Sequence, residues 1–563
     1  DASATENGNG GAIVVWSNIY RRESETYAHG TFISKGGENG GDGGLIETSG
    51  YFLNTDGALV NASSDLGNAG TWLLDPYDIT ISATTTTGTY NANYTAAANT
   101  SNVNTTDIQN TLNAGTNVTI QTGLLGSAGS QSGDITVNSA ISKTLGNAAT
   151  LTLTAYRNVT INAAIGSTSN ALGLTVTATT GALSGNGNLT LNGGALSVTQ
   201  ATDGIYSGII SGTASTLTKA GAGTLTLSGA NTYTGATTIG SGTTLKLGAA
   251  GVISDSSAVT ANGTLDLNSY SETIGSLAGS GTVTSSAAGT PTLTLGGDNT
   301  STTFSGVIQN GSGTVSIYKS GTGVFTLSGA NSYTGATTVP YGQIKLGAAQ
   351  TNLTAYDISS GAFLDLGGYS ATIGSLAGAG SVTSTASGSI TLTAGNASST
   401  TFSGIIQDGS GTVAFTKAGT GTLTLSGTNT FSGGLIVSNG ILKVGAVGNS
   451  LFTPLGSYAG TVSVSNGATL DLNGFTLGTS QALTINGAGY GSGGALTKTS
   501  STAVTYSGLV ALGSSVAGNK FEEELEVARI MGDNAKVAEL QEKLFETTAL
   551  KAFESGTTDI LIE

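Results

Sequence analysis

Gly223 to Gly235 reads GTLTLSGANTYTG, and near copies follow at Gly323 to Gly335 (GVFTLSGANSYTG) and at Gly421 to Gly433 (GTLTLSGTNTFSG). The copies repeat with a period of about 100 residues. In each copy apolar residues alternate with threonine before a turn of Gly, Ser and Asn, which predicts a short half-buried strand followed by a turn. Strands that recur at a long fixed period are typical of folds in which similar units stack on one another.

The alternation continues outside these copies, at Thr244 to Leu247 and at Thr264 to Leu267. Other segments keep the same phase, because Thr273 to Gly279 (TIGSLAG) recurs at Thr372 to Gly378. A unit of about 100 residues has room for about four or five coils of about 20 residues. We therefore predict an all-β chain folded as a parallel β-helix, or β-solenoid, whose core is supplied by stacked coils. No helix is expected before the last segment of the chain.

The composition limits the function classes. The 563 residues include 89 glycines, and the low shares of charged (9%) and aromatic (6%) residues do not fit several globular cores. The absence of cysteine fits a protein exported across an outer membrane, since no disulfide can lock it beforehand. A net charge of -16 lacks the positive surface that nucleic acid or an anionic membrane requires, and no apolar run approaches the roughly 18–20 residues of a membrane span. We expect no nucleic-acid partner and no membrane insertion.

Three segments are predicted. Residues 1–200 carry both tryptophans and a different repeat type, and residues 201–518 contain the repeats quoted above. Residues 519–563 form an acidic tail, whose apolar residues fall at helical spacing and predict a short helical hairpin and a terminal strand. The tail is interpreted as a cap on the last coil or as an assembly or anchoring element. Its candidate residues are Phe521, Leu525, Leu540, Leu544, Phe553, Ile560, Leu561 and Ile562.

Gly70 to Ser82 reads GTWLLDPYDITIS, which resembles filamentous-haemagglutinin-like exoproteins of two-partner secretion systems. Ala12 to Trp16 (AIVVW), Ile108 to Ile120 (IQNTLNAGTNVTI), Gly133 to Val137 (GDITV) and Leu151 to Ile161 (LTLTAYRNVTI) are similar to that family in order and spacing. The resemblance covers residues ~1–175 and implies export through an outer-membrane secretion partner. The family's amino-terminal secretion domain is absent from this sequence, which we interpret as the result of processing.

Residues ~215–480 resemble autotransporter-associated β-strand repeats, carried by the segment LTLSGANTYTG at 225–235 and its copies. Together the two resemblances imply a secreted, right-handed β-helix with a role in adhesion or in biofilm and matrix attachment. They imply host or matrix glycans and proteins as receptors. The acidic tail matches no anchor of either family.

The glycine-rich stretch from Gly36 to Gly44 contains Glu38 and Asp42, and it resembles one copy of a calcium-binding nonapeptide repeat. One copy cannot supply ligands from neighbouring coils. The stretch is therefore interpreted as a turn that needs positive φ, with a calcium site at Asp42 and Glu38 as the alternative.

Asp266, Asp365 and Asp471 all lie in Leu-Asp-Leu, and repeated carboxylates on a β-helix invite comparison with polysaccharide-cleaving enzymes. Their positions follow the repeat, whereas a catalytic pair needs a local acid and base. His29 is the only histidine, and without cysteine the sequence offers no zinc site and no Cys/His or Ser/His/Asp arrangement. We predict that the chain is not an enzyme and has no cofactor, and that His29 lies at a strand end.

Tyr233, Tyr333 and Phe431 recur once per repeat, each two residues after an asparagine. Such a row could stack on sugars. The interpretation that we favour is that the aromatic rings pack inside the solenoid while the asparagine side chains satisfy backbone groups of the turns.

These observations predict a secreted or cell-surface bacterial adhesin, in which a β-helix presents many weak polar contacts at once. The first alternative is a self-assembling extracellular filament subunit, a homo-oligomer joined head to tail through its solenoid ends and its tail. A polysaccharide-active β-helix enzyme is the third interpretation.

Overall fold

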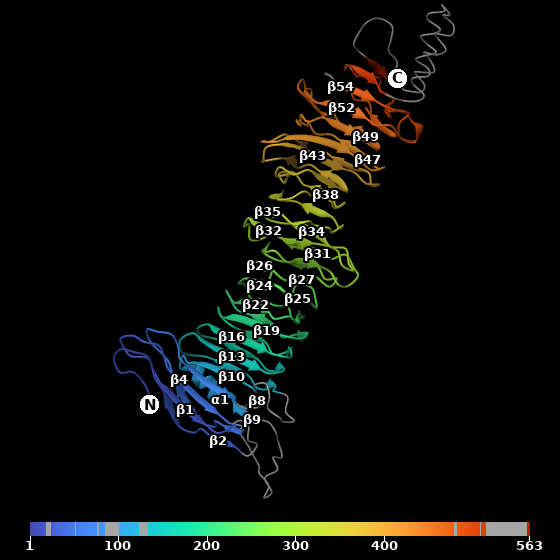
Figure 1. Cartoon of the computed structure of the whole chain (residues 1–563). Coiled ribbons are helices and arrows are strands. Elements are labelled where there is room, and N and C mark those ends of the chain that lie inside the picture. Colours follow the sequence, from blue (N-terminus) through green and yellow to red (C-terminus); the bar gives the residue numbers. More distant parts are fainter. Residues whose placement is uncertain are drawn as a thin grey trace, which may run out of the picture. The chain divides into compact units, whose positions relative to one another are not determined.

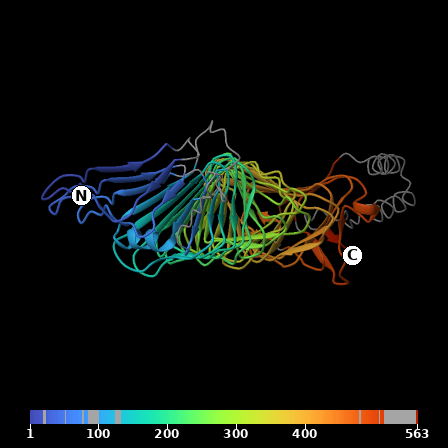
Figure 2. The same ribbon diagram turned by 90° about the horizontal axis from the view of Figure 1, so that it is seen from below.

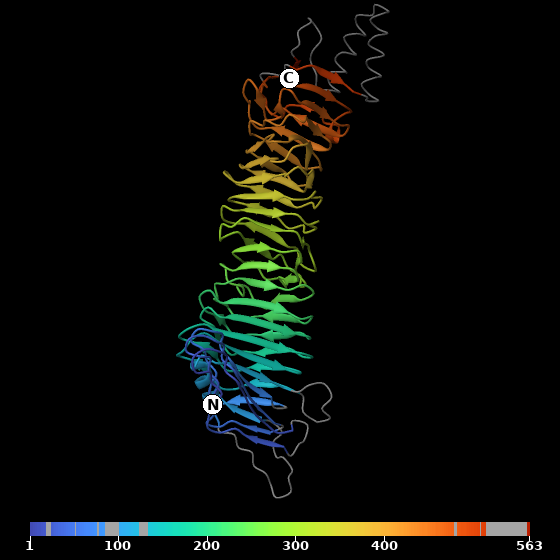
Figure 3. The ribbon, with the colours of Figure 1, turned by 60° about the vertical axis from the view of Figure 1, so that its left-hand side comes forward.

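A computed structural model describes residues 1–18, 24–50, 52–75, 78–84, 101–122, 133–477, 481–506, 508–513 and 560–562. The chain divides into two compact units, unit 1 (Asp1–Pro291) and unit 2 (Thr292–Glu563). Both are built from short β-strands, and within each unit the strands of successive coils lie one above the next (Figures 1 and 3). In Figure 2 the teal and green coils of unit 1 overlap, as stacked coils do when they are viewed from below.

The described residues of unit 1 form three parallel sheets of more than two strands. Sheet 1 consists, in order, of β1 (Ala12–Trp16), β4 (Leu45–Ser49), β7 (Thr71–Asp75), β10 (Asn117–Gln121), β13 (Ala149–Ala155), β16 (Leu172–Ala178), β19 (Ala195–Gln200), β22 (Thr216–Ala220), β24 (Thr237–Ile239), β26 (Ala258–Ala261) and β29 (Ser276–Ala278). Sheet 2 consists of β9 (Ser101–Asn104), β8 (Ile79–Ser82), β11 (Ile135–Val137), β14 (Val159–Ile161), β17 (Leu183–Gly185), β20 (Gly204–Tyr206), β23 (Thr224–Leu227), β25 (Thr244–Leu247), β27 (Thr264–Asp266) and β30 (Thr282–Thr284). Sheet 3 consists of β12 (Ile141–Lys143), β15 (Ile165–Ser167), β18 (Leu189–Thr190) and β21 (Ile210–Ser211).

The first coils of unit 1 differ from the later ones. They add the parallel pairs β2 (Glu25–Tyr27) with β5 (Phe52–Asn54) and β3 (Thr31–Ile33) with β6 (Leu59–Asn61). A helix, α1 (Thr105–Asn113), follows β9, and β28 (Glu272–Thr273) lies near the end of the unit. No helix is predicted here from the sequence, so α1 is a correction to that prediction. A helix of nine residues is too short to produce a clear apolar period, although Asn104 caps it by accepting a hydrogen bond from the N–H of Thr106.

Unit 2 repeats the architecture, with three parallel sheets of more than two strands among the residues whose positions are described. Sheet 4 consists of β31 (Thr292–Leu295), β34 (Ser316–Lys319), β36 (Thr337–Val339), β38 (Ala355–Ile358), β41 (Ser375–Gly378), β44 (Thr400–Phe402), β47 (Thr422–Leu425), β49 (Gly440–Val444), β53 (Ala468–Asp471) and β55 (Leu496–Thr497). Sheet 5 consists of β32 (Thr302–Phe304), β35 (Val324–Leu327), β37 (Gln343–Leu346), β39 (Phe363–Asp365), β42 (Ser381–Thr383) and β45 (Ile405–Ile406). Sheet 6 consists of β40 (Ala371–Ile373), β43 (Ser389–Ala394), β46 (Thr412–Lys417), β48 (Leu435–Val437), β52 (Thr461–Val464), β54 (Ala482–Ile485) and β57 (Val510–Leu512). The other elements are β33 (Val307–Ile308), the antiparallel pairs β50 (Phe452–Thr453) with β51 (Gly456–Ser457) and β56 (Val504–Tyr506) with β58 (Ile560–Ile562), and the 3-10 turn Tyr490–Ser492.

The register explains why alternating sequences form this fold. In sheet 1, Leu151, Leu174, Leu196 and Leu217 lie directly above one another, so a coil here contains 21 to 23 residues. These leucines are at most 1% exposed, whereas the threonines between them face outward. Burying one such side chain contributes about 1.5–3 kcal/mol, so a narrow column of apolar residues supplies the core.

The predicted fold class, an all-β, right-handed parallel β-helix, is confirmed, since the strands of successive coils pair in parallel in each long sheet. Connections between parallel strands of one sheet are right-handed in nearly all known folds. The predicted terminal strand is also present, because Ile560, Leu561 and Ile562 form β58 beside β56. The predicted helical hairpin lies outside the described residues. In the part of the chain that the structure describes, no helix is long and apolar enough to cross a membrane.

The predicted boundary between residues 200 and 201 lies inside unit 1, where β19 pairs with β22 and sheet 1 continues. The continuation of sheet 1 agrees with the expectation that the repeats continue the β-helix, and the chain divides into its two compact units between residues 291 and 292. The change of repeat type near residue 200 and the separate tail after residue 518 stay predictions.

Candidate functional site

The most regular polar clusters are built on the three Leu-Asp-Leu aspartates. Lys246 approaches Asp266 from the preceding coil, with 3.7 Å between Nζ and Oδ2. The distance between Nζ and Oδ2 is also 3.7 Å in the ion pair Lys345–Asp365 and in the ion pair Lys443–Asp471. The aspartates are almost completely buried and the lysines are partly exposed, so each repeat carries one ion pair at its surface.

The carboxylates of these clusters also bind the following coil. Oδ1 of Asp365 accepts hydrogen bonds from the N–H groups of Gly367 and Thr385, both at 2.9 Å, and Oδ2 accepts one at 2.6 Å from the hydroxyl of Thr385. Asp471 makes the same contacts with Asn473 and Thr499. Each aspartate thus connects three coils, and its oxygens serve the backbone of the solenoid.

A second repeated feature is a lysine at an inward-facing position. Lys219, Lys319 and Lys417 are at most 1% exposed, and the Nζ of each donates to the carbonyl oxygens of the next two residues. The distances are 2.6 and 3.1 Å for Lys319 and 2.7 and 3.0 Å for Lys417. These lysines therefore clamp the Gly turn that follows their strand, and burial lowers the pKa of Lys219 and Lys417 to about 8. The sequence analysis did not single them out, although Lys219 falls in the inward phase set by Leu217.

The buried lysines predict a pH dependence of stability. Between pH 8 and pH 9.5 an unfolded lysine stays protonated, because its pKa is about 10.4, whereas Lys417 loses its proton in the folded chain. The unfolded state then binds more protons, so stability rises with pH over this window. We expect the free energy of unfolding of the wild type to rise by about 1 kcal/mol relative to Lys417→Met, measured by urea denaturation at both pH values. An equal pH dependence in the two proteins would contradict this assignment.

The repeated asparagines and aromatic residues serve the interior. Tyr233 and Tyr333 are 0% exposed and Phe431 is 1% exposed, so the favoured interpretation, that these rings pack inside the solenoid, is confirmed and stacking on sugars is excluded. The hydroxyl groups of Tyr233 and Tyr333 lie 2.7 and 2.8 Å from those of Thr237 and Thr337.

The asparagine side chains satisfy the backbone groups of adjacent coils, as the packing alternative proposed. Oδ1 of Asn231 accepts from the N–H of Ile210 at 2.7 Å, and its Nδ2 donates to the carbonyl of Val252 at 2.6 Å. Asn331 and Asn429 accept from the equivalent N–H groups at 2.8 Å.

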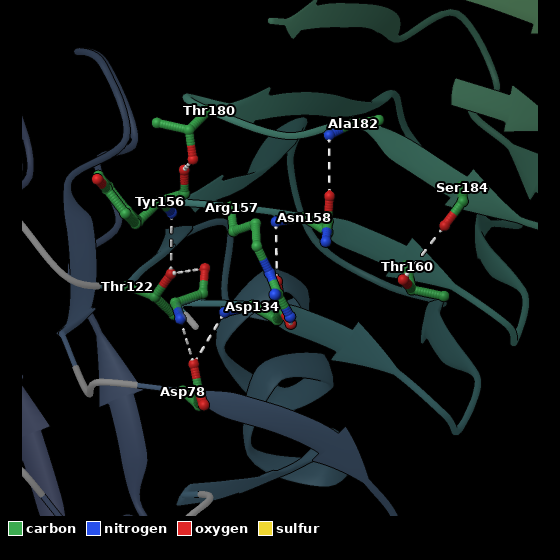
Figure 4. A network of polar contacts seen from close by, with 11 residues as sticks. Asp78, Thr122, Asp134, Tyr156, Arg157, Asn158, Thr160, Thr180, Ala182 and Ser184 are labelled. Atoms are coloured by element: carbon green, nitrogen blue, oxygen red, sulfur yellow. Dashed lines mark hydrogen bonds and ion pairs between the residues drawn. The ribbon is translucent and has the colours of Figure 1, made fainter. Parts of the chain in front are cut away.

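A polar ladder runs along one edge of sheet 2 in unit 1 (Figure 4). Asp78, Asp134 and Asn158 each precede a strand, and each accepts a hydrogen bond from the backbone of the next coil. The pKa of Asp134 is lowered, because hydrogen bonds from the guanidinium of Arg157 and the N–H of Asn158 outweigh the opposing effect of burial. The ladder gives a physical reason for the Asp or Asn in the segments DITI, GDITV and NVTI.

The predicted calcium residues lie in a glycine turn. Gly37 and Gly40 form an isolated antiparallel bridge, and Gly40 and Gly41 have φ of 140° and 125°, as such a turn requires. Oδ1 of Asp42 accepts from the backbone N–H of Asn68 at 2.7 Å and from its side chain at 3.1 Å, while Glu38 is exposed. Among the residues with described positions, no three His, Cys, Asp or Glu side chains form a group suited to a metal ion. The calcium site stays a prediction.

The remaining predicted residues are placed as follows. His29 follows β2, as expected for a residue at a strand end, and its Nδ1 lies 2.7 Å from the carbonyl oxygen of Asp56. Of the predicted capping residues, Phe521, Leu525, Leu540, Leu544 and Phe553 lie outside the described residues. Ile560 to Ile562 form β58. Their role in capping or assembly stays a prediction.

Comparisons with known proteins support the repeat part of the chain. A family model described as passenger-associated-transport-repeat matches residues 217–247, 317–340 and 415–444, and each match includes one of the three clamping lysines of the repeats. The chain is 34% identical over 322 residues to the adhesin BmaC autotransporter of Brucella suis biovar 1 (strain 1330). That similarity covers 51% of this chain but only 9% of the relative. The predicted autotransporter-type repeats are thus confirmed, and the matches indicate a secreted or cell-surface protein.

Proposed function

We propose that this chain belongs to a surface adhesin and acts as a stacked-coil scaffold without catalytic activity. The strongest support comes from the contacts that the repeated residues make. The Leu-Asp-Leu aspartates and the asparagines bind neighbouring coils, and the inward lysines hold the turns that follow their own strands. The features that recur most regularly therefore build the scaffold. The matched passenger repeats and the adhesin relative agree with this role.

The proposed mode of adhesion is multivalent. Outward-facing hydroxyl groups recur on successive coils, for example at Thr152, Thr175, Ser197 and Thr218 in sheet 1. Many weak polar contacts made together can hold a surface without any deep pocket. We take host or matrix glycans and proteins as the receptors, with attachment within a biofilm as one setting.

The export route is proposed from residues ~1–175, whose segments resemble filamentous-haemagglutinin-like exoproteins. An outer-membrane secretion partner would carry the chain across the outer membrane. A chain without cysteine suits such a route, because disulfides cannot fix a folded form before translocation.

A filament subunit is the second candidate, favoured by the first strand of sheet 1. On β1, the outward-facing Trp16 is 66% exposed and Val14 is 49% exposed, whereas Ser49, which pairs with Trp16 on the neighbouring β4, is 2% exposed. An apolar strand at the edge of a sheet can accept a strand from another molecule.

The adhesin proposal is tested with beads coated with the full chain. Coated beads are expected to bind cultured cells or deposited matrix several times more than albumin-coated beads, and soluble chain should compete. Binding equal to that of the albumin beads would contradict adhesion.

The two alternatives need separate experiments. New reducing or unsaturated ends after incubation with a polysaccharide panel would contradict the non-enzymatic role. Electron microscopy at rising concentration, with and without residues 519–563, tests the filament, since long fibres only in the full chain would favour assembly.

A further inference from the structure

The helix α1 buries an acidic side chain against the first coils of unit 1. Thr105, Asp107, Ile108, Thr111 and Leu112 form its buried face, and Asp107 is only 3% exposed. A carboxyl group in the first turn of a helix is favoured by the helix dipole when it is solvated. Here it faces the protein instead of water.

The surroundings of Asp107 do not compensate a full negative charge. Its carboxyl group accepts a hydrogen bond from the N–H of Gly57, in the turn between β5 and β6. Its Oδ2 atom is buried and has no hydrogen-bond partner within the described ranges, and the same holds for the hydroxyl of Thr55 in that turn. A buried, unpaired carboxylate oxygen is costly, whereas a neutral carboxyl group avoids most of this cost.

The charged groups around α1 have opposing effects on the ionisation of Asp107. Asp56 disfavours the ionised form of Asp107 and His29 favours it. Lys143 on β12, a strand that packs on α1, directs its Nζ to the carbonyls of Leu145 and Gly146 at 2.6 and 3.1 Å. Its ammonium group is therefore engaged elsewhere.

We propose that α1 is a proton-controlled latch, which is held on the turn between β5 and β6 when Asp107 is neutral and opens more often when Asp107 is ionised. The neutral side chain removes the penalty of the unpaired oxygen and the repulsion from Asp56. Ionisation restores both, and the helix can relieve them by local opening, which gives the carboxylate access to water.

The direction of the pH dependence follows from burial, which raises the pKa of Asp107 to about 7, together with the nearby charge of Asp56. In the opened helix this pKa returns to its ordinary value of about 3.9. The closed form therefore binds more protons between these values. Its stability is greatest below about pH 4 and falls as the pH rises toward 7.

Hydrogen exchange of the α1 amides in the full chain tests the latch, with rates corrected for the intrinsic effect of pH. From pH 5.5 to pH 8 we expect protection of Ile108 to Asn113 to fall on the order of tenfold. Amides of β13, in the same unit, serve as the internal control and should keep their protection. Asp107→Asn, which mimics the neutral acid, should remain protected at both pH values.

His29 also acts on the charge of Asp107, so His29→Gln is the matched control. Retention of the pH effect in His29→Gln and its loss in Asp107→Asn would support the latch. The opposite pattern would overturn it in favour of the histidine. Protection of α1 that does not change with pH in the wild type would overturn it as well.

Discussion

Replacing Tyr333 by alanine is expected to lower the free energy of unfolding of unit 2 by about 3–5 kcal/mol. The ring is 0% exposed, and its removal leaves a cavity that the surrounding stacked coils cannot fill without shifting. The hydroxyl of Tyr333, 2.8 Å from that of Thr337, adds a smaller contribution. Urea denaturation followed by circular dichroism measures the loss.

The third repeat provides the control for this substitution, because it carries Phe431 at the position of Tyr333. Tyr333→Phe keeps the ring and removes the hydroxyl, so we expect a cost of about 1 kcal/mol. An alanine variant as stable as the phenylalanine variant would show that the ring is not part of the core. If both were as stable as the wild type, residue 333 would contribute nothing to the packing of its coil.

The fold could be predicted from the sequence because strand periodicity and repeat periodicity agree. The alternation of leucine with threonine assigns one face of each strand to the core, and the long repeat requires that the coils stack. Leu151 above Leu174 is the direct result. The boundary between the compact units could not be predicted from periodicity or composition. The clearest change of composition lies near residue 200, and sheet 1 continues across it.

The roles of individual polar residues were harder to infer. A lysine in a strand is usually assigned to the outward face, but Lys219, Lys319 and Lys417 point inward and bind carbonyl oxygens. The sequence did contain a signal, because each lysine lies two residues after an inward-facing apolar residue of its strand and therefore on the same face. The helix α1 was missed because Ile108 and Leu112 are its apolar residues, and two such residues are too few to show a helical period. Asn104 and Asp107 nevertheless have the spacing of a helix start.

The repeated asparagines show why a single polar side chain can hold three coils together. Oδ1 of Asn429 accepts from the N–H of Ile406 at 2.8 Å, and its Nδ2 donates to the carbonyl of Pro454 at 2.7 Å. The residue is 0% exposed, so water cannot replace either bond. Hydrophobic stacking alone would leave both backbone groups unpaired.

We therefore expect Asn429→Ala to lower the free energy of unfolding of unit 2 by about 2–5 kcal/mol, because it leaves one buried N–H and one buried carbonyl without partners. Asn449 is the matched control, since it also binds backbone N–H groups, at 2.9 Å to Leu451 and Phe452, but lies exposed. Asn449→Ala should cost at most about 1 kcal/mol, because water takes over its bonds. If urea denaturation gave the same loss of unfolding free energy for both variants, burial would not determine how much these hydrogen bonds contribute to stability. The inference that the asparagines bridge the coils would then be wrong.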